Sequence, residues 1–352
     1  MSARSRIAQI GCGRIGQVHL RNLFAYPERC ELAALVDANE PALTSIAADY
    51  RLTNISTDPS IVFDDPTIDG VIIASSTETH AAYIIEAARC GKSVFTEKPI
   101  ALDLESTDRA LAAVDETGTR LQVGFQRRFD RGYAAARQAI ENGDLGAIEM
   151  IRDAMRDPAP PPLAYLEKSG GLYRDMTIHN FDCVRWLMGD DPVELFAMGS
   201  ALTGDDIVAA NDIDTSIVSM RFPDGSLASI ENSRRSGFGY DVRTEVFGSK
   251  GALHVGDSRQ TPVRRYDASG VREDHQYFFL ERFRDAYEAE ILSFLQAVID
   301  DTDVAVTGAD GRAALRLAIM AESSRQSGRP VVASEFPSEI EIEPLSRMII
   351  SA

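Results

Sequence analysis

Short apolar runs alternate with helical patterns through the first 125 residues of the chain. The runs are long enough for strands and too short for helices, and their consecutive apolar positions are typical of strands buried on both faces. They cover residues 6–10, 31–37, 70–75, 92–97 and 120–125. Between them, residues 15–24, 80–90 and 103–116 have apolar positions at helical spacing, and Gly91 and Gly118 end the last two segments. Strands that alternate with helices predict a parallel, doubly wound sheet.

The pattern changes after about residue 146. A helix is predicted over residues 174–188, and alternating apolar and polar positions then predict five strands. These strands cover residues 195–202, 217–222, 226–233, 241–248 and 252–257. Two amphipathic helices follow, at about 283–301 and 309–326. We therefore predict an α/β protein with a doubly wound domain over 1–125, followed by an α+β domain with a mostly antiparallel sheet over 126–352.

Composition narrows the range of functions. The chain of 352 residues has a formal net charge of −18, which argues against a nucleic-acid partner because affinity for phosphate backbones comes mainly from Lys and Arg. Its four cysteines, at positions 12, 30, 90 and 183, form no C-x-x-C pair and no cluster with histidine, so neither a zinc site nor a disulfide framework is predicted. The sequence has no signal-peptide pattern and no apolar stretch of about 20 residues. We therefore expect a cytoplasmic protein with no membrane partner.

A glycine-rich loop follows the first predicted strand. Gly11, Gly13 and Gly16 form the pattern G-x-G-x-x-G, with Arg14 and Ile15 between the last two glycines. In a dinucleotide-binding loop, the first glycine makes the tight turn, the second lets the pyrophosphate approach the backbone, and the third lets the helix pack against the sheet. The free N–H groups of the helix N-terminus then bind the phosphates. A plain turn between a strand and a helix is the alternative interpretation.

An acidic residue ends the second predicted strand. Asp37 comes 21 residues after Gly16, where a carboxylate can hold the hydroxyls of the adenosine ribose. A 2′-phosphate would meet the negative charge of Asp37, and the next two residues, Ala38 and Asn39, supply no cation. The sequence therefore favours NAD over NADP, although Arg14 is a cation within reach of a 2′-phosphate. A solvated acid at a strand end is the alternative.

A lysine stands directly after the fifth predicted strand, in the sequence Glu97-Lys98-Pro99. Open α/β sheets bind ligands at the carboxyl ends of their strands, so Lys98 is expected beside the reactive end of a dinucleotide. A cation there can hydrogen-bond the reacting oxygen and stabilise the charge that it acquires. By itself, a lysine at a strand end is more often a surface charge.

A candidate base lies in the predicted helix at 174–188. Asp175 and His179 are four residues apart, so on a helix they share one face. A carboxylate beside an imidazole can fix its tautomer and stabilise its protonated form. Two alternatives stay open: a structural helix pair, and a metal site that also uses Asp182. No H-E-x-x-H pattern or further histidine cluster supports a metal, so none is predicted.

The three motifs together resemble the glucose–fructose oxidoreductase and inositol dehydrogenase (Gfo/Idh/MocA) family. They are the G-x-G-x-x-G loop, Glu-Lys-Pro after the fifth strand, and G-G-x-x-x-D-x-x-I-H on a helix. Further segments are similar to those of the inositol 2-dehydrogenases, and the likeness covers essentially the whole chain. These segments are residues 123–130, 156–158, 239–251 and 277–283.

The resemblance implies an NAD-binding Rossmann domain over 1–125 and a domain with a large, open sheet for substrate binding and oligomerisation over 126–352. In this family the exposed sheet face usually builds a tetramer, so a homotetramer is expected. The resemblance also implies that Lys98 binds the reacting hydroxyl, that His179 is the base and that Asp175 supports it. The segments that line the sugar in relatives carry Arg127, Asp157 and Tyr240, and those that line the cofactor carry Ser75, Ser76, His80, Glu97 and Gln126.

Two positions depart from the family pattern. Relatives commonly have Ile-His-Asp where this chain has Asn180 after His179, so a negative charge next to the proposed base is missing. Val242 also stands where a polar residue is expected. The departure at Asn180 bears on which substrate is bound more than on the chemistry.

The resemblance implies NAD-dependent oxidation of one secondary hydroxyl of a cyclic polyol, with myo-inositol to 2-keto-myo-inositol favoured. Another cyclic substrate stays open: scyllo-inositol, chiro-inositol, a pyranose or levoglucosan. A non-catalytic NAD-binding regulator of the same fold is an alternative from another class, but Lys98, Asp175 and His179 are all present. A metal-dependent lyase or hydrolase lacks a predicted ligand cluster.

Overall fold

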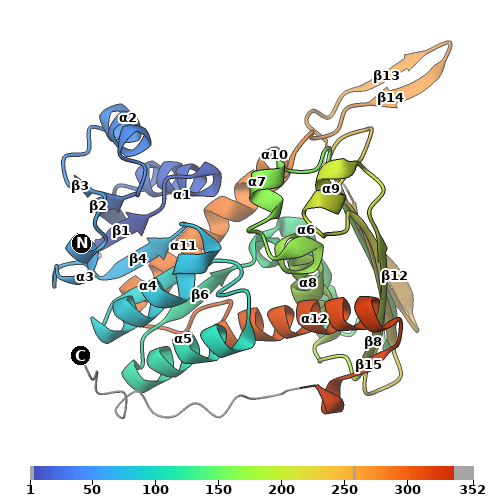
Figure 1. The fold of residues 1–352 in the computed structure, drawn as a ribbon. Coiled ribbons are helices and arrows are strands. Elements are labelled where there is room, and N and C mark those ends of the chain that lie inside the picture. The colour runs from blue at the N-terminus through green and yellow to red at the C-terminus, as the bar shows by residue number, and fades with distance from the viewer. Residues whose placement is uncertain (1–3, 257–258, 337–352) are drawn as a thin grey trace. The chain divides into compact units, whose positions relative to one another are not determined.

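The computed structural model describes residues 4–256 and 259–336, which divide into two compact units. The first unit contains the described part of Met1–Phe125 together with Tyr287–Leu315. The second contains the described parts of Gln126–Ala286 and Arg316–Ser338. Figure 1 shows a sheet with helices in each unit. None of the helices in these described ranges is both long and apolar enough to span a bilayer.

The sheet of the first unit is parallel throughout and has the strand order β3-β2-β1-β4-β5-β6. This confirms the predicted doubly wound fold, and the five predicted strands are all present. The strands are β1 (Ser5–Ile10), β2 (Cys30–Val36), β3 (Ile55–Ser56), β4 (Gly70–Ile73), β5 (Ser93–Glu97) and β6 (Leu121–Gly124). The two-residue β3 was missed, because two residues carry no periodicity. The order of the strands reverses between β1 and β4, where such sheets bind ligands at the carboxyl ends of the strands.

Helix ends in the first unit have residues that cap or terminate a helix. Asp103 caps α5 by accepting a 2.7 Å hydrogen bond from the Ser106 N–H, and Gly118 ends that helix at φ 65°, which glycine adopts without strain. The helices are α1 (Arg14–Ala25), α2 (Glu40–Tyr50), α3 (Ser60–Phe63), α4 (Thr77–Arg89), α5 (Leu104–Thr117), most of α11 (Arg284–Asp300) and the start of α12 (Gly308–Ser327).

The core of the first unit is built from two distant parts of the chain. Ile7, Ile72 and Phe95 from the sheet pack with Ile291 and Phe294 from α11, and each side chain is fully buried. Burying one side chain of this size stabilises a fold by about 1.5–3 kcal/mol. Tyr287–Leu315, which lies between the two parts of the second unit in the sequence, is therefore an integral part of the first unit.

The second unit contains a seven-stranded sheet in the order β12-β11-β7-β10-β9-β8-β15. All its pairs are antiparallel except β10 with β7, so the sheet is mixed and mostly antiparallel, as predicted. The strands are β7 (Ile148–Arg156), β8 (Glu194–Ser200), β9 (Thr215–Arg221), β10 (Leu227–Ser233), β11 (Asp241–Gly248), β12 (Gly251–Val255) and β15 (Val331–Val332), and a separate hairpin contains β13 (Arg264–Asp267) and β14 (Gly270–Glu273). The central strand β7 was missed because charged residues interrupt its alternation.

Helices cover one face of this sheet. α8 (Ile178–Met188) packs on β7, and α6 (Arg131–Glu141) packs on α8 and β12. The remaining elements of the unit are η1 (Gln126–Phe129), α7 (Leu163–Leu166), η2 (Tyr173–Thr177), α9 (Asp205–Ala209), α10 (Phe279–Arg282), η3 (Ala333–Glu335) and the end of α12.

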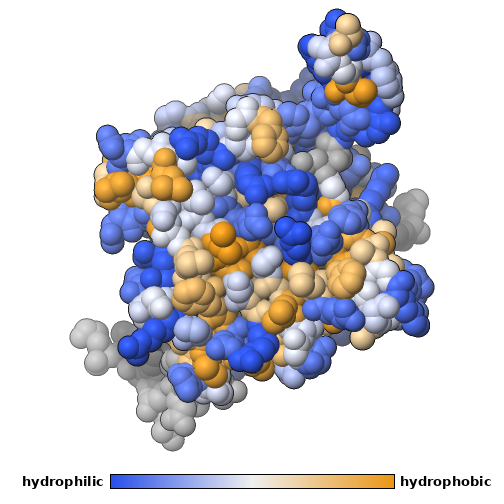
Figure 2. All heavy atoms as spheres, turned by 90° about the vertical axis from the view of Figure 1, so that its right-hand side faces the viewer, coloured by the Kyte–Doolittle hydropathy of each residue, from blue (hydrophilic) through white to orange (hydrophobic). Residues whose placement is uncertain are grey.

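The other face of the sheet is open. Leu227, Met150 and Phe247 are paired across β10, β7 and β11, so they form one row on this face, and each is 40–47% exposed. Met198 and Ile217 form a second pair on β8 and β9. In Figure 2, apolar side chains lie among polar ones on the side of the molecule that faces the viewer.

Candidate active site

The glycine loop has the geometry that a bound pyrophosphate needs. Gly11 has φ 102°, and a Cβ on it would lie 2.3 Å from the Ala74 carbonyl oxygen. A Cβ on Gly16 would lie 2.3 Å from the Gly11 carbonyl oxygen, whereas one on Gly13 would meet no atom within 4 Å. Gly11 and Gly16 are therefore required by packing. Gly13, which precedes Arg14 at the start of α1, leaves open space where the phosphates are expected.

Asp37 anchors the glycine loop at the end of β2. Its carboxylate accepts hydrogen bonds from the backbone N–H groups of Cys12 (2.6 Å) and Asn39 (2.8 Å). Burial, with a further contribution from the charge of Asp37, raises the pKa of the Cys12 thiol to about 12. Cys12 is therefore an inert neutral thiol in this loop, and Asp37 is half-buried at the position predicted for ribose binding.

The loop after β4 is tied to the loop after β5. The ring of His80 is 2% exposed and lies between two carbonyl oxygens, 2.9 Å from that of Pro99 and 3.1 Å from that of Ser75. Burial lowers the pKa of His80, so the ring is neutral and donates to one of the two. The Ser75 hydroxyl lies 2.7 Å from that of Thr79, and Ser76 precedes α4. His80 thus holds together the two loops that carry Ser75 and Lys98.

A buried cluster of three ionisable residues lies behind Lys98. His19 Nε2 lies 2.7 Å from Glu97 Oε1, and ligand atoms of His19, Glu97 and Glu290 lie within 4.8 Å of one another. Burial, and then the charge of Glu97, raises the pKa of Glu290 well above its usual value. His19 and Glu97 form a hydrogen-bonded pair, and both carboxylate oxygens of Glu290 beside it lack a hydrogen-bond partner among the described residues. Glu97 therefore faces the interior, while Lys98 is half-buried at the end of β5.

Asp175 and His179 lie on the accessible side of their segment. The predicted regular helix is interrupted, because residues 173–177 form the π-helical turn η2 before α8 begins at Ile178. π-Helical turns occur frequently at functional sites. Asp175 and His179 are half-buried, whereas Met176 and Thr177 between them are buried. The segment thus presents a carboxylate and an imidazole together.

The predicted sugar-binding residues Arg127 and Tyr240 meet at one methionine. Arg127 is 1% exposed; its Nη1 donates to Asp153 Oδ2 (3.3 Å) and its Nη2 lies 2.6 Å from Met155 Sδ. The Tyr240 hydroxyl lies 3.4 Å from the same sulfur, and burial raises the pKa of this tyrosine. Asp157 is half-buried just after β7, where its backbone N–H donates to the Ser233 carbonyl oxygen. These three residues therefore lie at one end of the sheet.

Asn180, one of the two departures from the family pattern, has a structural role. It is fully buried, donates to Asp153 Oδ2 (2.8 Å) and accepts from Asn232 Nδ2 (3.0 Å). An aspartate here would place a second carboxylate against Asp153, whose pKa burial already raises. Asn180 thus fixes α8 to the sheet.

The other departure and two further predicted positions are also buried. Val242 is fully buried within β11, where an apolar side chain suits the core. Gln126 is 3% exposed, and its Oε1 has no hydrogen-bond partner among the described residues. Asp182, considered above as a metal ligand, accepts a 2.9 Å hydrogen bond from Arg128 Nε, so its charge is already compensated.

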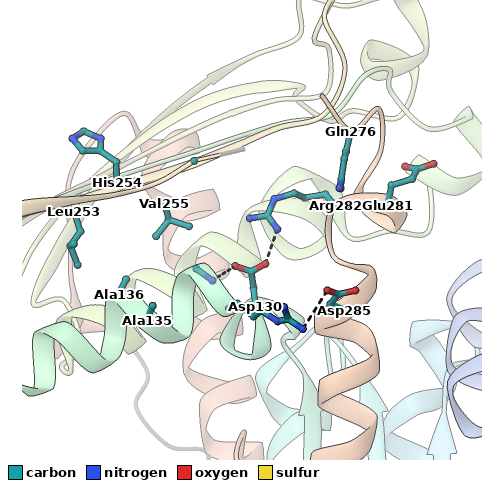
Figure 3. A pocket seen from close by; sticks show the side chains of 13 residues that line it. Asp130, Ala135, Ala136, Leu253, His254, Val255, Gln276, Glu281, Arg282 and Asp285 are labelled. Atoms are coloured by element: carbon teal, nitrogen blue, oxygen red, sulfur yellow. Dashed lines mark hydrogen bonds and ion pairs between the residues drawn. The ribbon is translucent and has the colours of Figure 1, made fainter. Parts of the chain in front are cut away.

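A cavity of about 660 Å³ in the second unit lies away from the predicted residues. Figure 3 shows it between α6, β12 and the chain around α10, with Asp130 facing Arg282 across a 2.7 Å hydrogen bond. None of the thirteen residues that line it belongs to the predicted site. This cavity is therefore separate from the residues of the candidate active site.

Each unit thus contains some of the predicted site residues. The first holds the glycine loop, Asp37 and Lys98, and the second holds Arg127 and the Asp175–His179 segment. Four further residues that contact or surround these were not predicted: Arg234, Tyr165, Asp153 and Glu290. No local spacing marks them, since their partners are distant in the sequence.

Two family models match the chain. Residues 5–125 match the oxidoreductase family with an NAD-binding Rossmann fold, and residues 133–254 match the GFO/IDH/MocA C-terminal domain. Among curated relatives, the myo-inositol 2-dehydrogenase of Thermotoga maritima is 42% identical over 331 residues, which cover 94% of this chain and 99% of the relative. The inositol 2-dehydrogenase of Rhizobium meliloti is 40% identical, with 93% of this chain and 98% of the relative covered.

Solved structures agree with these matches. A probable dehydrogenase from Thermotoga maritima superposes with a TM-score of 0.92 at 41% identity, covering 94% of this chain and 100% of that chain. The scyllo-inositol dehydrogenase of Lactobacillus casei, solved with bound NAD(H) and scyllo-inositol, gives a TM-score of 0.88 at 27% identity, covering 94% and 100%. With an NAD-binding Rossmann domain, the characteristic second domain and relatives of this likeness along nearly its whole length, the chain belongs to the GFO/IDH/MocA family of oxidoreductases.

Proposed function

We propose that the chain oxidises one secondary hydroxyl of a cyclic polyol with NAD, and that its main reaction converts myo-inositol to 2-keto-myo-inositol. The observation that carries this proposal is the presence of Lys98 at the carboxyl end of β5 and of Asp175 and His179 on the accessible side of one segment. The chain keeps this set within a sequence about two-fifths identical to inositol 2-dehydrogenases.

The residues have complementary roles in this proposal. When bound at the glycine loop, NAD would supply the acceptor for the hydride that leaves the carbon. His179 takes the hydroxyl proton, Asp175 stabilises the imidazolium that forms, and Lys98 stabilises negative charge on the oxygen. The open space at Gly13 and the half-buried carboxylate of Asp37 fit the pyrophosphate and the adenosine ribose of the dinucleotide. Ser75, Ser76, Gln126, Arg14 and Ile15 complete the proposed cofactor site, with His80 and Glu97 supporting its loops.

Several hydroxyls of the polyol need partners, and Arg127, Asp157 and Tyr240 supply donors and acceptors. A site that hydrogen-bonds particular hydroxyls discriminates strongly against a substrate that leaves those groups unpaired. We therefore assign substrate binding to these residues together with Lys98 and the Asp175–His179 pair. The proposed functional regions are 1–125 for NAD and 126–352 for substrate binding and assembly.

A screen for NADH absorbance tests the function directly. The purified chain is incubated with NAD and, in turn, myo-, scyllo- and chiro-inositol, glucose, xylose and levoglucosan. We expect the highest kcat/KM with myo-inositol. A preference for another cyclic sugar would change the substrate while keeping the chemistry, and no NADH with any of them would contradict the proposal.

Cofactor choice provides a first prediction. We expect NAD to be used more efficiently than NADP at equal concentration, because a 2′-phosphate would lie against the Asp37 carboxylate. Asp37→Ala should narrow this preference, measured as the ratio of kcat/KM values for the two cofactors. Since Asp37 also holds the Cys12 and Asn39 backbone, the variant's unfolding curve must be compared with that of the wild type. Equal use of NAD and NADP by the wild type would refute this role.

Assembly provides a second prediction, and we propose a homotetramer. The open sheet face carries the row Leu227, Met150 and Phe247, and burying such a face against a second copy is an economical solution. Light scattering at micromolar concentration should report a tetramer, and Leu227→Lys with Phe247→Lys should dissociate it. Val208→Lys, which changes an exposed apolar side chain on α9, is the matched control. A monomeric wild type would contradict the proposed homotetramer.

We also propose a cytoplasmic location. All four cysteines are free thiols, and three of them are buried. Such usage suits a reducing compartment. A small cyclic polyol is the expected binding partner, with neither nucleic acid nor membrane required. Fractionation of the native cells, followed by assay of NAD-dependent polyol oxidation in each fraction, tests the location.

A further inference from the structure

Two donors from different segments hold the carboxylate of Asp175. Arg234, which follows β10, donates from Nη1 to Asp175 Oδ2 at 3.0 Å. Tyr165, in α7, donates from its hydroxyl to Asp175 Oδ1 at 2.8 Å. A carboxylate with a donor on each oxygen has little freedom to rotate. Its orientation is therefore set by these two partners as well as by its own backbone.

Arg234 is buried to a degree that is unusual for arginine. Its side chain is 1% exposed, and that of Asp175 is 14% exposed. A buried guanidinium is tolerated where carboxylates compensate its charge. Arg234 Nη2 lies 3.7 Å from Asp212 Oδ2, an ion-pair distance longer than a hydrogen bond. Asp175 is thus the carboxylate that hydrogen-bonds Arg234, at the shorter of the two distances.

The same cation is linked to the start of the segment that carries Asp175. Asp212 Oδ1 accepts a 3.0 Å hydrogen bond from the backbone N–H of Leu172, just before η2. A Cβ on Gly171 would lie 2.9 Å from this oxygen, so glycine permits the close approach of Asp212. The backbone N–H of Arg234 donates to the Asp214 carbonyl oxygen at 2.8 Å. Arg234 therefore lies between a carboxylate that fixes the start of the segment and the carboxylate inside it.

We propose that Arg234 is a positioning residue for the dehydrogenase reaction, because it fixes the charge and the orientation of the Asp175 carboxylate. The inference rests on the proposed function, in which Asp175 supports the base His179. Tyr165 is the second, more exposed donor to the same carboxylate. Without Arg234, Asp175 retains its place in the chain but loses the partner that holds Oδ2. The rival explanation is that Arg234 merely links η2 to the sheet for stability.

The central test is a double-mutant cycle on kcat for the best polyol. Arg234→Gln should lower kcat by about 10- to 100-fold, a part of the 10²–10⁴-fold that a positioned general base contributes. The KM for the polyol should change little. In the Asp175→Asn background the same substitution should add almost nothing, because interacting residues are not additive. A purely structural link predicts the opposite: the two losses multiply.

Matched variants control for folding. Arg235→Gln removes the same charge from the next, exposed residue and should leave kcat and KM unchanged. Arg234→Lys keeps a cation and should restore part of the kcat lost in Arg234→Gln. Tyr165→Phe removes one hydroxyl from an exposed ring, so it should fold even where Arg234→Gln does not. It should lower kcat slightly in the wild-type background and leave kcat of Asp175→Asn unchanged.

The outcomes separate this inference from the proposed function. A wild type that oxidises no cyclic polyol overturns the proposed function, and the role of Arg234 with it. An active wild type whose kcat is unaffected by Arg234→Gln overturns the positioning role alone. Multiplicative losses in the cycle, or equal losses in Arg234→Gln and Arg234→Lys with a lowered unfolding free energy, assign Arg234 to stability instead. If Arg234→Gln does not fold, a Tyr165→Phe loss that persists in the Asp175→Asn background likewise overturns the inference.

Discussion

Replacing His179 with alanine is expected to lower kcat/KM for polyol oxidation by about 10²–10⁴-fold, the range for a lost general base. Oxidation releases a hydride to NAD and a proton to the protein, so a group that is unprotonated near neutral pH must contact the hydroxyl. An unperturbed imidazole, which titrates near about pH 6.5, meets this need. The wild-type kcat/KM should therefore also fall as the pH is lowered and a proton occupies the ring. Initial rates of NADH formation over a pH series measure both effects.

A substitution of another histidine serves as the control for His179→Ala. His254 lies on β12 with 68% of its side chain exposed, so His254→Ala should retain the wild-type rate. Near-wild-type turnover in His179→Ala would mean that the Asp175–His179 segment has a structural role. Asp175→Asn should be milder than His179→Ala, because it weakens the support of the base without deleting the proton acceptor.

Replacing Lys98 with methionine is expected to cost at least as much activity as His179→Ala. Methionine keeps much of the length and apolar character of the lysine stem but removes the charge that stabilises the reacting oxygen. NAD affinity should change little, because the glycine loop and Asp37 lie at β1 and β2 whereas Lys98 follows β5. A stopped assay gives the rate, and quenching of intrinsic fluorescence on NAD addition gives the NAD affinity.

Two comparisons make the lysine test specific. Lys250→Met removes a charge from an exposed lysine between β11 and β12 and should leave both quantities unchanged. A Lys98→Met variant that loses NAD binding and activity in parallel would place Lys98 in cofactor binding instead of catalysis. Full activity in that variant would refute its role altogether.

The fold was predictable where periodicity and burial agree. The strands of the first unit are buried on both faces, so their apolar runs stand out from the sequence. β7 did not stand out, because charged residues interrupt this central strand. Asp153 is buried against Arg127, and Arg156 pairs with Asp241. Interactions with distant residues make these charges acceptable in a sheet, and a local pattern contains no trace of them.

The candidate site likewise contains residues that the sequence predicted and residues that only the structure revealed. Glycine spacing and the four-residue interval between Asp175 and His179 are local signals, and both were found. Arg234 is 59 residues from Asp175, and Asn180 is 27 residues from Asp153, so only the folded chain reveals these contacts. The π-helical turn was missed as well, since side-chain spacing does not distinguish one wider turn from a regular helix.

The first unit is built from two segments that are distant in the sequence, and this has a consequence for biosynthesis. Chains emerge from the ribosome N-terminus first, and domains generally fold as units. Residues 4–125 emerge long before Tyr287–Leu315, which completes their compact unit. Until α11 has been synthesised, Ile7, Ile72 and Phe95 lack their partners Ile291 and Phe294 and leave apolar surface uncovered. The dinucleotide-binding half of the nascent chain therefore cannot complete its core until most of the chain has been synthesised, and its apolar residues stay exposed during that interval.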